Sequence, residues 1–355
     1  MDKVDLEQAA ALAGRVGDEV SVAMSVLNLY LGYRLELFRA MEEVGPCTAE
    51  ELARATGMSE RYLREWLECM ASCRYIEHDA ASRRFALTPE QEAVYLVPDH
   101  PAHALPSVAF IPSLASVLPR LMQAFRQGTG VPFEEYGEDL VDAQGAAYRP
   151  IFENDLVSSW LAAMPDIEAR LRRGARVADV GCGVGWSSIA IARAFPEVRI
   201  DAIEPDGRSV VAARRNAAEA GLADRIRFHQ VGIEEAPVAG PFDMVTLFEC
   251  LHDMAYPVDA LRAMRKLLAP DGAALVSDEK VAESLEENTG PLGRLYYNFS
   301  VLHCLPQSMA HPGSAATGAV IRPSTVRRYA AEAGFERVEI LPVDHPLFHL
   351  YRLGA

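Results

Sequence analysis

The stretch VADVGCGVGWSS, residues 177–188, places Gly181, Gly183 and Gly185 directly after a short apolar run. An apolar run that opens through glycines into a helix is typical of the first strand of a nucleotide-binding α/β domain. Glycine suits this turn because a ligand can approach the backbone N–H groups at the start of the helix. We therefore expect a strand over 176–180 and a helix over 187–195.

The spacing of these glycines differs from the dinucleotide fingerprint. The pattern GxGxxG would place a glycine at position 186, where the chain has Trp186. In addition, Asp179 precedes the first glycine, and a carboxylate at this position would repel a phosphate. The loop is therefore not expected to bind a pyrophosphate.

A second acidic residue indicates which ligand the loop binds. Glu204 follows the next apolar run, 199–203, so its carboxylate stands at the tip of the second strand and can accept hydrogen bonds from both hydroxyls of a ribose. Asp179 suits a ligand with a positive end. Together, Asp179, Glu204 and the glycine loop predict S-adenosylmethionine as the cofactor.

From about residue 176 the sequence alternates short apolar runs with amphipathic helices, which is typical of a parallel sheet in an α/β domain. The last two strands are separated by a short connection and should form an antiparallel hairpin at the edge of the sheet. The predicted strands are Arg176–Val180, Arg199–Ile203, Ile226–Gln230, Met244–Glu249, Ala273–Ser277, Arg337–Val343 and Phe348–Leu353.

The N-terminal part has a different pattern. Two apolar helices are expected between about 5 and 42, and residues 48–87 predict helix, turn, helix and two short strands, 75–77 and 84–87, which is a winged-helix outline. Arg61 and Arg64 on the second helix of this segment are matched by glutamates, so the helix has no basic face for a DNA groove. A packing or dimerisation module is favoured over a DNA-binding one.

The bulk properties agree with small-molecule chemistry. A chain of 355 residues suits two domains, and a net charge of −16 opposes nucleic-acid binding. There is no apolar span of about 18 residues, and the acidic N-terminus does not resemble a signal peptide, so we expect a cytoplasmic protein without membrane contact. The six cysteines lack metal-ligand spacing, so neither a disulfide nor a metal is predicted.

At the glycine loop and Glu204 the chain resembles the class I S-adenosylmethionine-dependent methyltransferases, and the resemblance covers about 175–355. The segment from Leu35 to Glu77 is similar to the winged-helix dimerisation domain of small-molecule O-methyltransferases of the plant phenolic and bacterial polyketide kind, and the whole chain resembles an actinobacterial branch of them. The resemblance implies a homodimer with a helical winged-helix domain over 1–100, connector helices over 101–172 that wall the acceptor pocket, and a Rossmann-like catalytic domain over 173–355 with an insertion at about 281–321.

The resemblance also implies a set of cofactor-binding residues. These are Asp179, Gly181, Gly183, Gly185, Glu204, Pro205, Gly232, Ile233 and Phe248. Where the family commonly has an acid near the adenine amine, this chain has Gly232, which supplies no carboxylate. The adenine contact must then come from the backbone, from packing on Ile233, or from Glu234, and the sequence leaves these alternatives open.

The segment from Phe248 to Met254 resembles the "HD" segment of plant-type O-methyltransferases, in which the histidine removes the proton of the acceptor hydroxyl. Carried over, His252 is the general base, which suits an imidazole because it titrates near neutrality. The alternative is a structural histidine at a strand end. Asp278 aligns with the acid that flanks the base and Glu279 lies beside it; either can orient His252.

The acceptor pocket is predicted from aromatic and neighbouring residues of the connector and the insertion. They are Tyr136, Trp160, Tyr296, Tyr297, Phe299, His303 and Met309. The predicted function is methyl transfer from S-adenosylmethionine to a small molecule at oxygen. One alternative is an N-, C- or S-methyltransferase that relies on proximity, and another is a ligand-sensing winged-helix transcriptional regulator.

Overall fold

The computed structural model describes residues 4–354, and the contacts divide the chain into two compact units. The first unit holds the residues up to Pro112 together with Asp142–Pro150. The second holds Ser113–Val141 together with the residues from Ile151 onward. The predicted connector is thus shared between the two units, and its separate boundaries at 101 and 172 stay a prediction.

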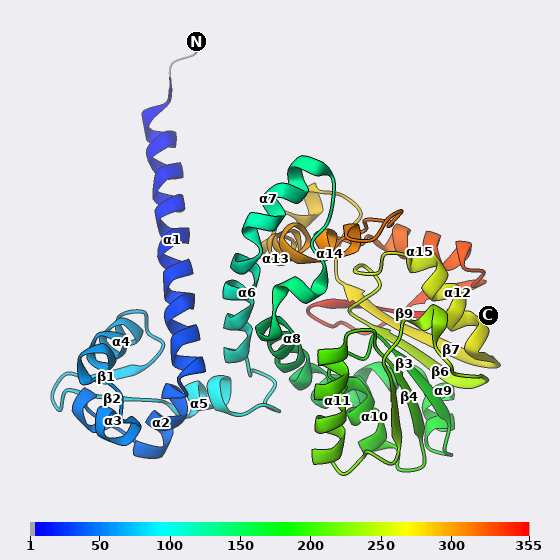
Figure 1. The fold of residues 1–355 in the computed structure, drawn as a ribbon, viewed down its shortest axis with the longest axis horizontal. Coiled ribbons are helices and arrows are strands. Elements are labelled where there is room, and N and C mark those ends of the chain that lie inside the picture. The colour runs from blue at the N-terminus through cyan, green and yellow to red at the C-terminus, as the bar shows by residue number, and fades with distance from the viewer. Residues whose placement is uncertain (1–3, 355) are drawn as a thin grey trace. The chain divides into compact units, whose positions relative to one another are not determined.

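The first unit is mainly helical and carries one small antiparallel hairpin (Figure 1). Its elements are α1 (Leu6–Arg34), α2 (Leu37–Val44), α3 (Ala49–Thr56), α4 (Glu60–Ser72), β1 (Glu77–Asp79), β2 (Arg84–Ala86), α5 (Pro89–Leu96) and the 3-10 helix η1 (Leu105–Ala109). The predicted winged-helix outline is confirmed.

Local signals set the helix boundaries in this unit. Thr48 and Glu51 form a reciprocal capping box at the start of α3, and Gly57 ends that helix with φ +71°, a left-handed conformation that favours glycine. The first strand was predicted two residues too early, at 75–77. Ile76 is instead buried in the core among the helices, so pairing with β2 begins only at Glu77.

Helix α1 exposes a long apolar stripe. Asp5 caps its N-terminus by accepting hydrogen bonds from the backbone N–H groups of Glu7 and Gln8. Six apolar side chains at spacings of three and four lie on one face and are 43–57% exposed: Leu12, Val16, Val20, Met24, Leu27 and Leu31. Residues 4–354 therefore leave most of this stripe exposed.

The second unit is built on a seven-stranded sheet of order β5-β4-β3-β6-β7-β9-β8 (Figure 1). The strands are β3 (Arg176–Val180), β4 (Arg199–Ile203), β5 (Ile226–His229), β6 (Phe242–Phe248), β7 (Leu268–Glu279), β8 (Arg337–Ile340) and β9 (Phe348–Gly354). The first five run parallel, whereas β9 is antiparallel to both β7 and β8. The predicted sheet and its C-terminal hairpin are confirmed.

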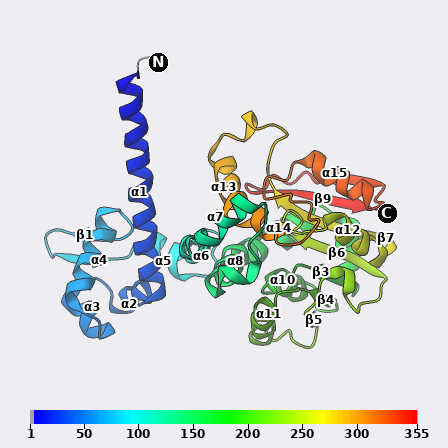
Figure 2. The same cartoon turned by 45° about the horizontal axis from the view of Figure 1, so that its top comes forward.

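Helices cover both faces of this sheet: α10 (Trp186–Ala194) and α11 (Gly207–Glu219) lie on one side, and α12 (Pro257–Leu267) and α15 (Pro323–Glu332) on the other (Figure 2). In addition, α9 (Pro165–Leu171) directly precedes β3, and η4 (Ile233–Glu235) lies between β5 and β6. Strand order reverses between β3 and its neighbours β4 and β6. In sheets of this kind, ligands bind at the carboxyl ends of the strands at such a reversal.

The remaining elements of this unit come from the connector and the insertion. They are α6 (Phe110–Ser116), α7 (Leu118–Gln127), η2 (Phe133–Tyr136), α8 (Glu138–Ile151, shared with the first unit), the π-helix η3 (Phe152–Leu161), η5 (Glu286–Asn288), α13 (Pro291–Phe299), the π-helix η6 (Ser300–Cys304) and α14 (Leu305–Met309). The backbone N–H of Val131 donates to the carbonyl of Pro306 at 2.9 Å, and the Tyr136 hydroxyl donates to the carbonyl of Leu302 at 2.9 Å. These bonds fix η2 against the insertion.

Between residues 4 and 354 we find no single helix that is both long and apolar enough to cross a membrane; one bent pair, Leu105–Ser116 with Leu118–Gln127, meets the length and composition requirement.

Candidate active site

The glycine loop after β3 adopts a conformation that glycine makes possible. Gly181, Gly183 and Gly185 have φ of +65°, +51° and +87°. A Cβ on Gly181 would lie 2.5 Å from Sγ of Cys250, so glycine is also needed for the close approach of the segment after β6, whereas Gly183 has open space on that side. The loop therefore exposes its backbone at the start of α10 and packs against the segment that leads to His252.

Asp179 is 1% exposed and is held by hydroxyl groups of its own chain. Ser187 and Ser188 donate to its Oδ2 at 2.6 Å, and Thr246 donates to Oδ1 at 2.7 Å. Burial raises the pKa of this carboxyl, although the three hydroxyl donors oppose the rise. These bonds tie β3 to β6 and to the first turn of α10, and a direct contact of Asp179 with the cofactor stays a prediction.

Glu204 stands at the end of β4 and braces the glycine loop. Its Oε2 accepts from the backbone N–H of Gly183 at 3.0 Å, and Oε1 accepts from the backbone N–H of Asp206 at 2.9 Å. Burial raises the pKa of Glu204 to about 7, against these two backbone donors, which lower it. A carboxylate with both oxygens at the loop edge has the geometry required to accept the hydroxyls of a ribose.

The other predicted cofactor residues surround this edge with different exposures. Ile233 is buried in the sheet core, Pro205 is exposed, and a Cβ on Gly232 would meet Oε2 of Glu234 at 3.2 Å. Phe248 is buried, with its ring 5.6 Å from both Phe152 and Trp160. The Glu234 carboxylate thus stands beside the position at which the family's acid is missing.

His252 follows β6 and is 3% exposed. Its Nδ1 lies 2.6 Å from Oδ1 of Asp278 and 2.9 Å from Oε2 of Glu279, both at the end of the neighbouring strand β7. The sequence left open which acid orients the ring, and the structure brings both to the same nitrogen. Nδ1 is hydrogen-bonded to Asp278, while Oε2 of Glu279 lies close by without forming a hydrogen bond, so Asp278 orients the ring and Nε2 points to the other side.

Burial and neighbouring charges shift the pKa values of His252 and of three acids beside it, Asp278, Glu279 and Glu249. Burial lowers the pKa of His252, but Asp278, Glu279 and Asp253 outweigh it and hold that pKa well above the usual value. The imidazolium holds the pKa of Asp278 below its usual range, even though burial opposes this, whereas burial and neighbouring acids raise the pKa of Glu279 and of Glu249. The charge of the cluster is therefore centred on His252 and Asp278, and burial disfavours the charged form of both glutamates.

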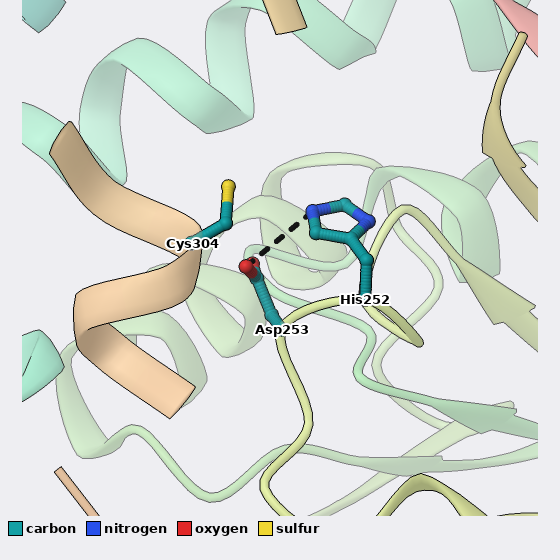
Figure 3. Close-up of side chains that lie close together, drawn as sticks. All are labelled: His252, Asp253 and Cys304. Atoms are coloured by element: carbon teal, nitrogen blue, oxygen red, sulfur yellow. Dashed lines mark ion pairs between the residues drawn. The ribbon is translucent and has the colours of Figure 1, made fainter. Parts of the chain in front are cut away.

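The opposite edge of the His252 ring faces Asp253 and Cys304 (Figure 3). Nε2 lies 3.4 Å from Oδ1 of Asp253, and Cys304 reaches the site from the π-helix η6. The ligand atoms of these three residues lie within 4.8 Å of one another, as do those of His252, Asp278 and Glu279. Either trio has the donor types of a metal site, but an ion in the first trio would occupy the nitrogen that is otherwise available to an acceptor.

The predicted acceptor residues do not all face this site. Trp160 is fully buried among the rings of Phe152, Phe248, His345 and Phe348, which is the environment of a core residue. The hydroxyl groups of Tyr136 and Tyr296 donate to the backbone carbonyls of Leu302 and Leu347. Tyr297, Phe299 and Met309 are half-buried on the insertion, and His303 is buried next to Cys304.

Two family profiles match the chain. One, described as an Rv2258c-like winged HTH domain, matches residues 23–97, and the other, described as a methyltransferase domain, matches residues 171–312. The ubiquinone biosynthesis O-methyltransferase of Aromatoleum aromaticum is 31% identical over 216 residues, which are 58% of this chain and 82% of that protein. The protein of the same name from Ralstonia nicotianae is 28% identical over 215 residues, 58% and 80% of the two chains.

The chain belongs to the S-adenosylmethionine-dependent methyltransferases.

Solved structures extend the likeness over the whole length of this methyltransferase. Mitomycin 7-O-methyltransferase MmcR gives a TM-score of 0.71 at 21% identity, covering 99% of this chain and 100% of that chain. Human N-acetylserotonin methyltransferase in complex with SAM gives 0.69 at 18% identity, covering 100% and 99%. At these identities the likeness establishes the shared fold, in which a winged-helix unit precedes the Rossmann-like unit.

Three residues of the methyltransferase site, Asp253, Glu249 and Cys304, were not predicted from the sequence. Asp253 follows His252 directly and its position in the "HD" pair was a usable signal, whereas Glu249 has only its place at a strand end. Glu249 has a φ of +53°, an uncommon value for a residue other than glycine and one that recurs at functional sites. Cys304 gave no signal, because the contact depends on how the insertion folds back.

Proposed function

We propose that this methyltransferase transfers a methyl group to a hydroxyl oxygen of a small molecule, with His252 as the general base. The observation that carries the proposal is the position of His252. It lies at the carboxyl end of β6, two residues from Cys250, which packs on Gly181 of the cofactor loop, and its Nδ1 is held by Asp278 at 2.6 Å. The base and the loop are thus close neighbours.

The residues of the cofactor loop fit S-adenosylmethionine. We assign ribose binding to Glu204. Gly181 and Gly183 let the ligand approach the backbone closely, and Asp179 shapes the loop through its hydrogen bonds with Ser187 and Ser188. When bound, S-adenosylmethionine supplies an electrophilic methyl group on a sulfonium sulfur. The Glu234 carboxylate beside Gly232 is our candidate for the adenine amine.

Proton removal is the step that the protein supplies. The O–H bond of the acceptor breaks and an N–H bond forms at Nε2 of neutral His252, while Asp278 stabilises the positive charge that develops on the ring. A base with a raised pKa matches the acidity of a phenol, whose pKa is about 10, better than an ordinary imidazole does. The consequence is a reaction that accelerates toward alkaline pH, where His252 is neutral.

We also propose that the protein is a homodimer through its first unit. The apolar stripe of α1 supports this, since an exposed apolar face of this length is typical of an interface. A second copy that presents the same face would cover it by an isologous contact. A separate observation argues against DNA binding: Arg61 and Arg64 of α4 form ion pairs with Glu65 and Glu60, respectively.

The first test is calorimetric titration of the protein with S-adenosylmethionine and with its demethylated product. Binding of both near micromolar is expected. Phenolic, carboxylic and amine acceptors are then screened for methyl transfer, and the products are analysed by mass spectrometry and NMR. A methyl group found on oxygen supports the proposal, and one found only on nitrogen, carbon or sulfur overturns it. Sequence-specific DNA retention without methyl transfer would favour the regulator.

A further inference from the structure

His303 is a buried polar residue that the proton transfer described above does not use. It lies on the π-helix η6, next to Cys304, and is 2% exposed. Its Nε2 has no hydrogen-bond partner among residues 4–354. Burial lowers the pKa of His303, so the ring is neutral at neutral pH. A buried ring nitrogen without a partner is uncommon in a folded protein and indicates a site at which a ligand or water completes the bond.

The surroundings of His303 fix the orientation of its ring. The ring of Tyr136 meets it edge to face with centroids 4.8 Å apart, and Phe133 does so at 5.9 Å. Tyr136 is itself tied to the carbonyl of Leu302, the residue before His303. The connector segment therefore holds this nitrogen in place before any ligand arrives. His303 is part of η6, the element that brings Cys304 close to His252 (Figure 3).

Cys304 places a protonated thiol beside one nitrogen of His303. Its Sγ lies 3.7 Å from Nδ1 of His303 and in hydrogen-bonding contact with His252. Burial raises the pKa of the Cys304 thiol well above its usual value, so the S–H proton is retained and can be donated to Nδ1. With Nδ1 as the acceptor, the neutral ring carries its hydrogen on Nε2, which makes Nε2 a donor.

We propose that His303 is a specificity-determining residue for the acceptor, and that its Nε2–H donates a hydrogen bond to an acceptor oxygen other than the one that is methylated. The proposal rests on the proposed O-methyl transfer. It assigns the acceptor to hydroxylated ring compounds that carry a second, hydrogen-bond-accepting oxygen, such as hydroxyquinones and hydroxyaryl ketones. The aromatic residues around His303 suit a flat ring, and a site with a fixed polar group discriminates against an analogue that lacks the matching atom.

The test compares matched acceptors with the full-length protein. One pair is a hydroxytetralone and the tetrahydronaphthol that lacks only its carbonyl, and a larger pair is a hydroxyanthraquinone and the corresponding hydroxyanthracene. In the wild type, kcat/KM should be about tenfold higher for the carbonyl-bearing member of the pair that is methylated. His303→Leu, which keeps the bulk and removes the donor, should abolish this preference. His303→Gln, whose amide N–H can replace Nε2–H, should keep most of it.

Thermal unfolding and affinity for S-adenosylmethionine show whether each variant is folded. A wild type without preference, or a preference that survives in His303→Leu, overturns the role of His303. If S-adenosylmethionine binds but neither member of either pair is methylated, the assigned acceptor class is overturned. Failure to bind S-adenosylmethionine, or methylation at an atom other than oxygen, instead overturns the proposed function on which the inference rests.

Discussion

Oδ1 of Asp278 lies 2.6 Å from Nδ1 of His252, and the ion pair joins two side chains that are almost completely buried at the ends of neighbouring strands. Glu279 reaches the same nitrogen at 2.9 Å, but it differs from Asp278 in charge, because its pKa is raised where that of Asp278 is lowered. The pair Asp278–His252 therefore carries the charge, and burial favours the uncharged form of Glu279.

This difference predicts unequal effects of two isosteric substitutions. Asp278→Asn removes the charge that raises the pKa of His252, so the rise of kcat/KM with pH should move to lower pH and the plateau should fall by about tenfold or more. Glu279→Gln removes little charge and should shift the profile less. The measurement is kcat/KM against pH for both variants and the wild type. Equal shifts, or none, would contradict the assignment of the charge to Asp278.

Glu204 predicts a pH dependence of cofactor binding. Its pKa is raised to about 7, and hydroxyl donors of a ribose favour the carboxylate, so the complex has the lower pKa. Affinity for S-adenosylmethionine should then rise between about pH 6 and about pH 8 and weaken as the pH falls through 7. Calorimetric titration of the wild type with S-adenosylmethionine at several pH values in this range measures the affinity.

The controls for that experiment are Glu204→Gln and Glu204→Ala. The glutamine variant should lose the pH dependence, and the alanine variant should weaken binding by about 2–4 kcal/mol, the contribution of a pair of charge-assisted hydrogen bonds. An alanine variant that binds with wild-type affinity would remove Glu204 from the cofactor site.

Asp179 predicts an effect on stability. Asp179→Ala leaves the hydroxyls of Ser187, Ser188 and Thr246 without their common acceptor, and at about 1 kcal/mol each the free energy of unfolding should fall by about 3 kcal/mol. Ser188→Ala, which removes one of these donors, is the matched control and should cost about a third as much. Chemical denaturation measures both. If Asp179→Ala weakened cofactor binding and left stability unchanged, Asp179 would be a direct ligand instead.

The fold was predictable because its signals are local. Each sheet strand is a short apolar run bounded by turns, and Glu204 could be assigned from its place after β4 alone. The first strand of the wing was misplaced because Tyr75 and Ile76 look like strand residues, although Ile76 is required by the helical core. At these two residues tertiary packing outweighed strand propensity.

The far side of the active site could not be predicted in the same way. Cys304 comes close to His252 and Asp253, with His303 next to it, only because the insertion folds back and the connector holds it there through Tyr136. Trp160 shows the converse: an aromatic residue expected to face the acceptor packs into the core. Contacts between segments far apart in sequence leave no periodicity, so residue type alone does not separate pocket from core.

The cluster at His252 predicts the response to metal removal. Since the proposed base needs Nε2 free, a protein dialysed against a strong chelator should retain its turnover. The measurement is the initial rate before and after dialysis, with metal content determined on the same samples. Loss of activity that Zn²⁺ restores in the wild type and not in Cys304→Ser would instead assign His252, Asp253 and Cys304 to a metal centre.

The stripe on α1 predicts the assembly state. Val16→Glu combined with Val20→Glu places two charges in the middle of the exposed apolar face, and burying them between two helices would be strongly unfavourable. Light scattering on a sizing column should give the mass of two chains for the wild type and of one chain for the double variant. Asp18→Lys, on the opposite face of the same helix, is the control and should remain dimeric. A wild type that is monomeric at micromolar concentration, or a double variant that stays dimeric, would show that another surface, or none, joins the copies.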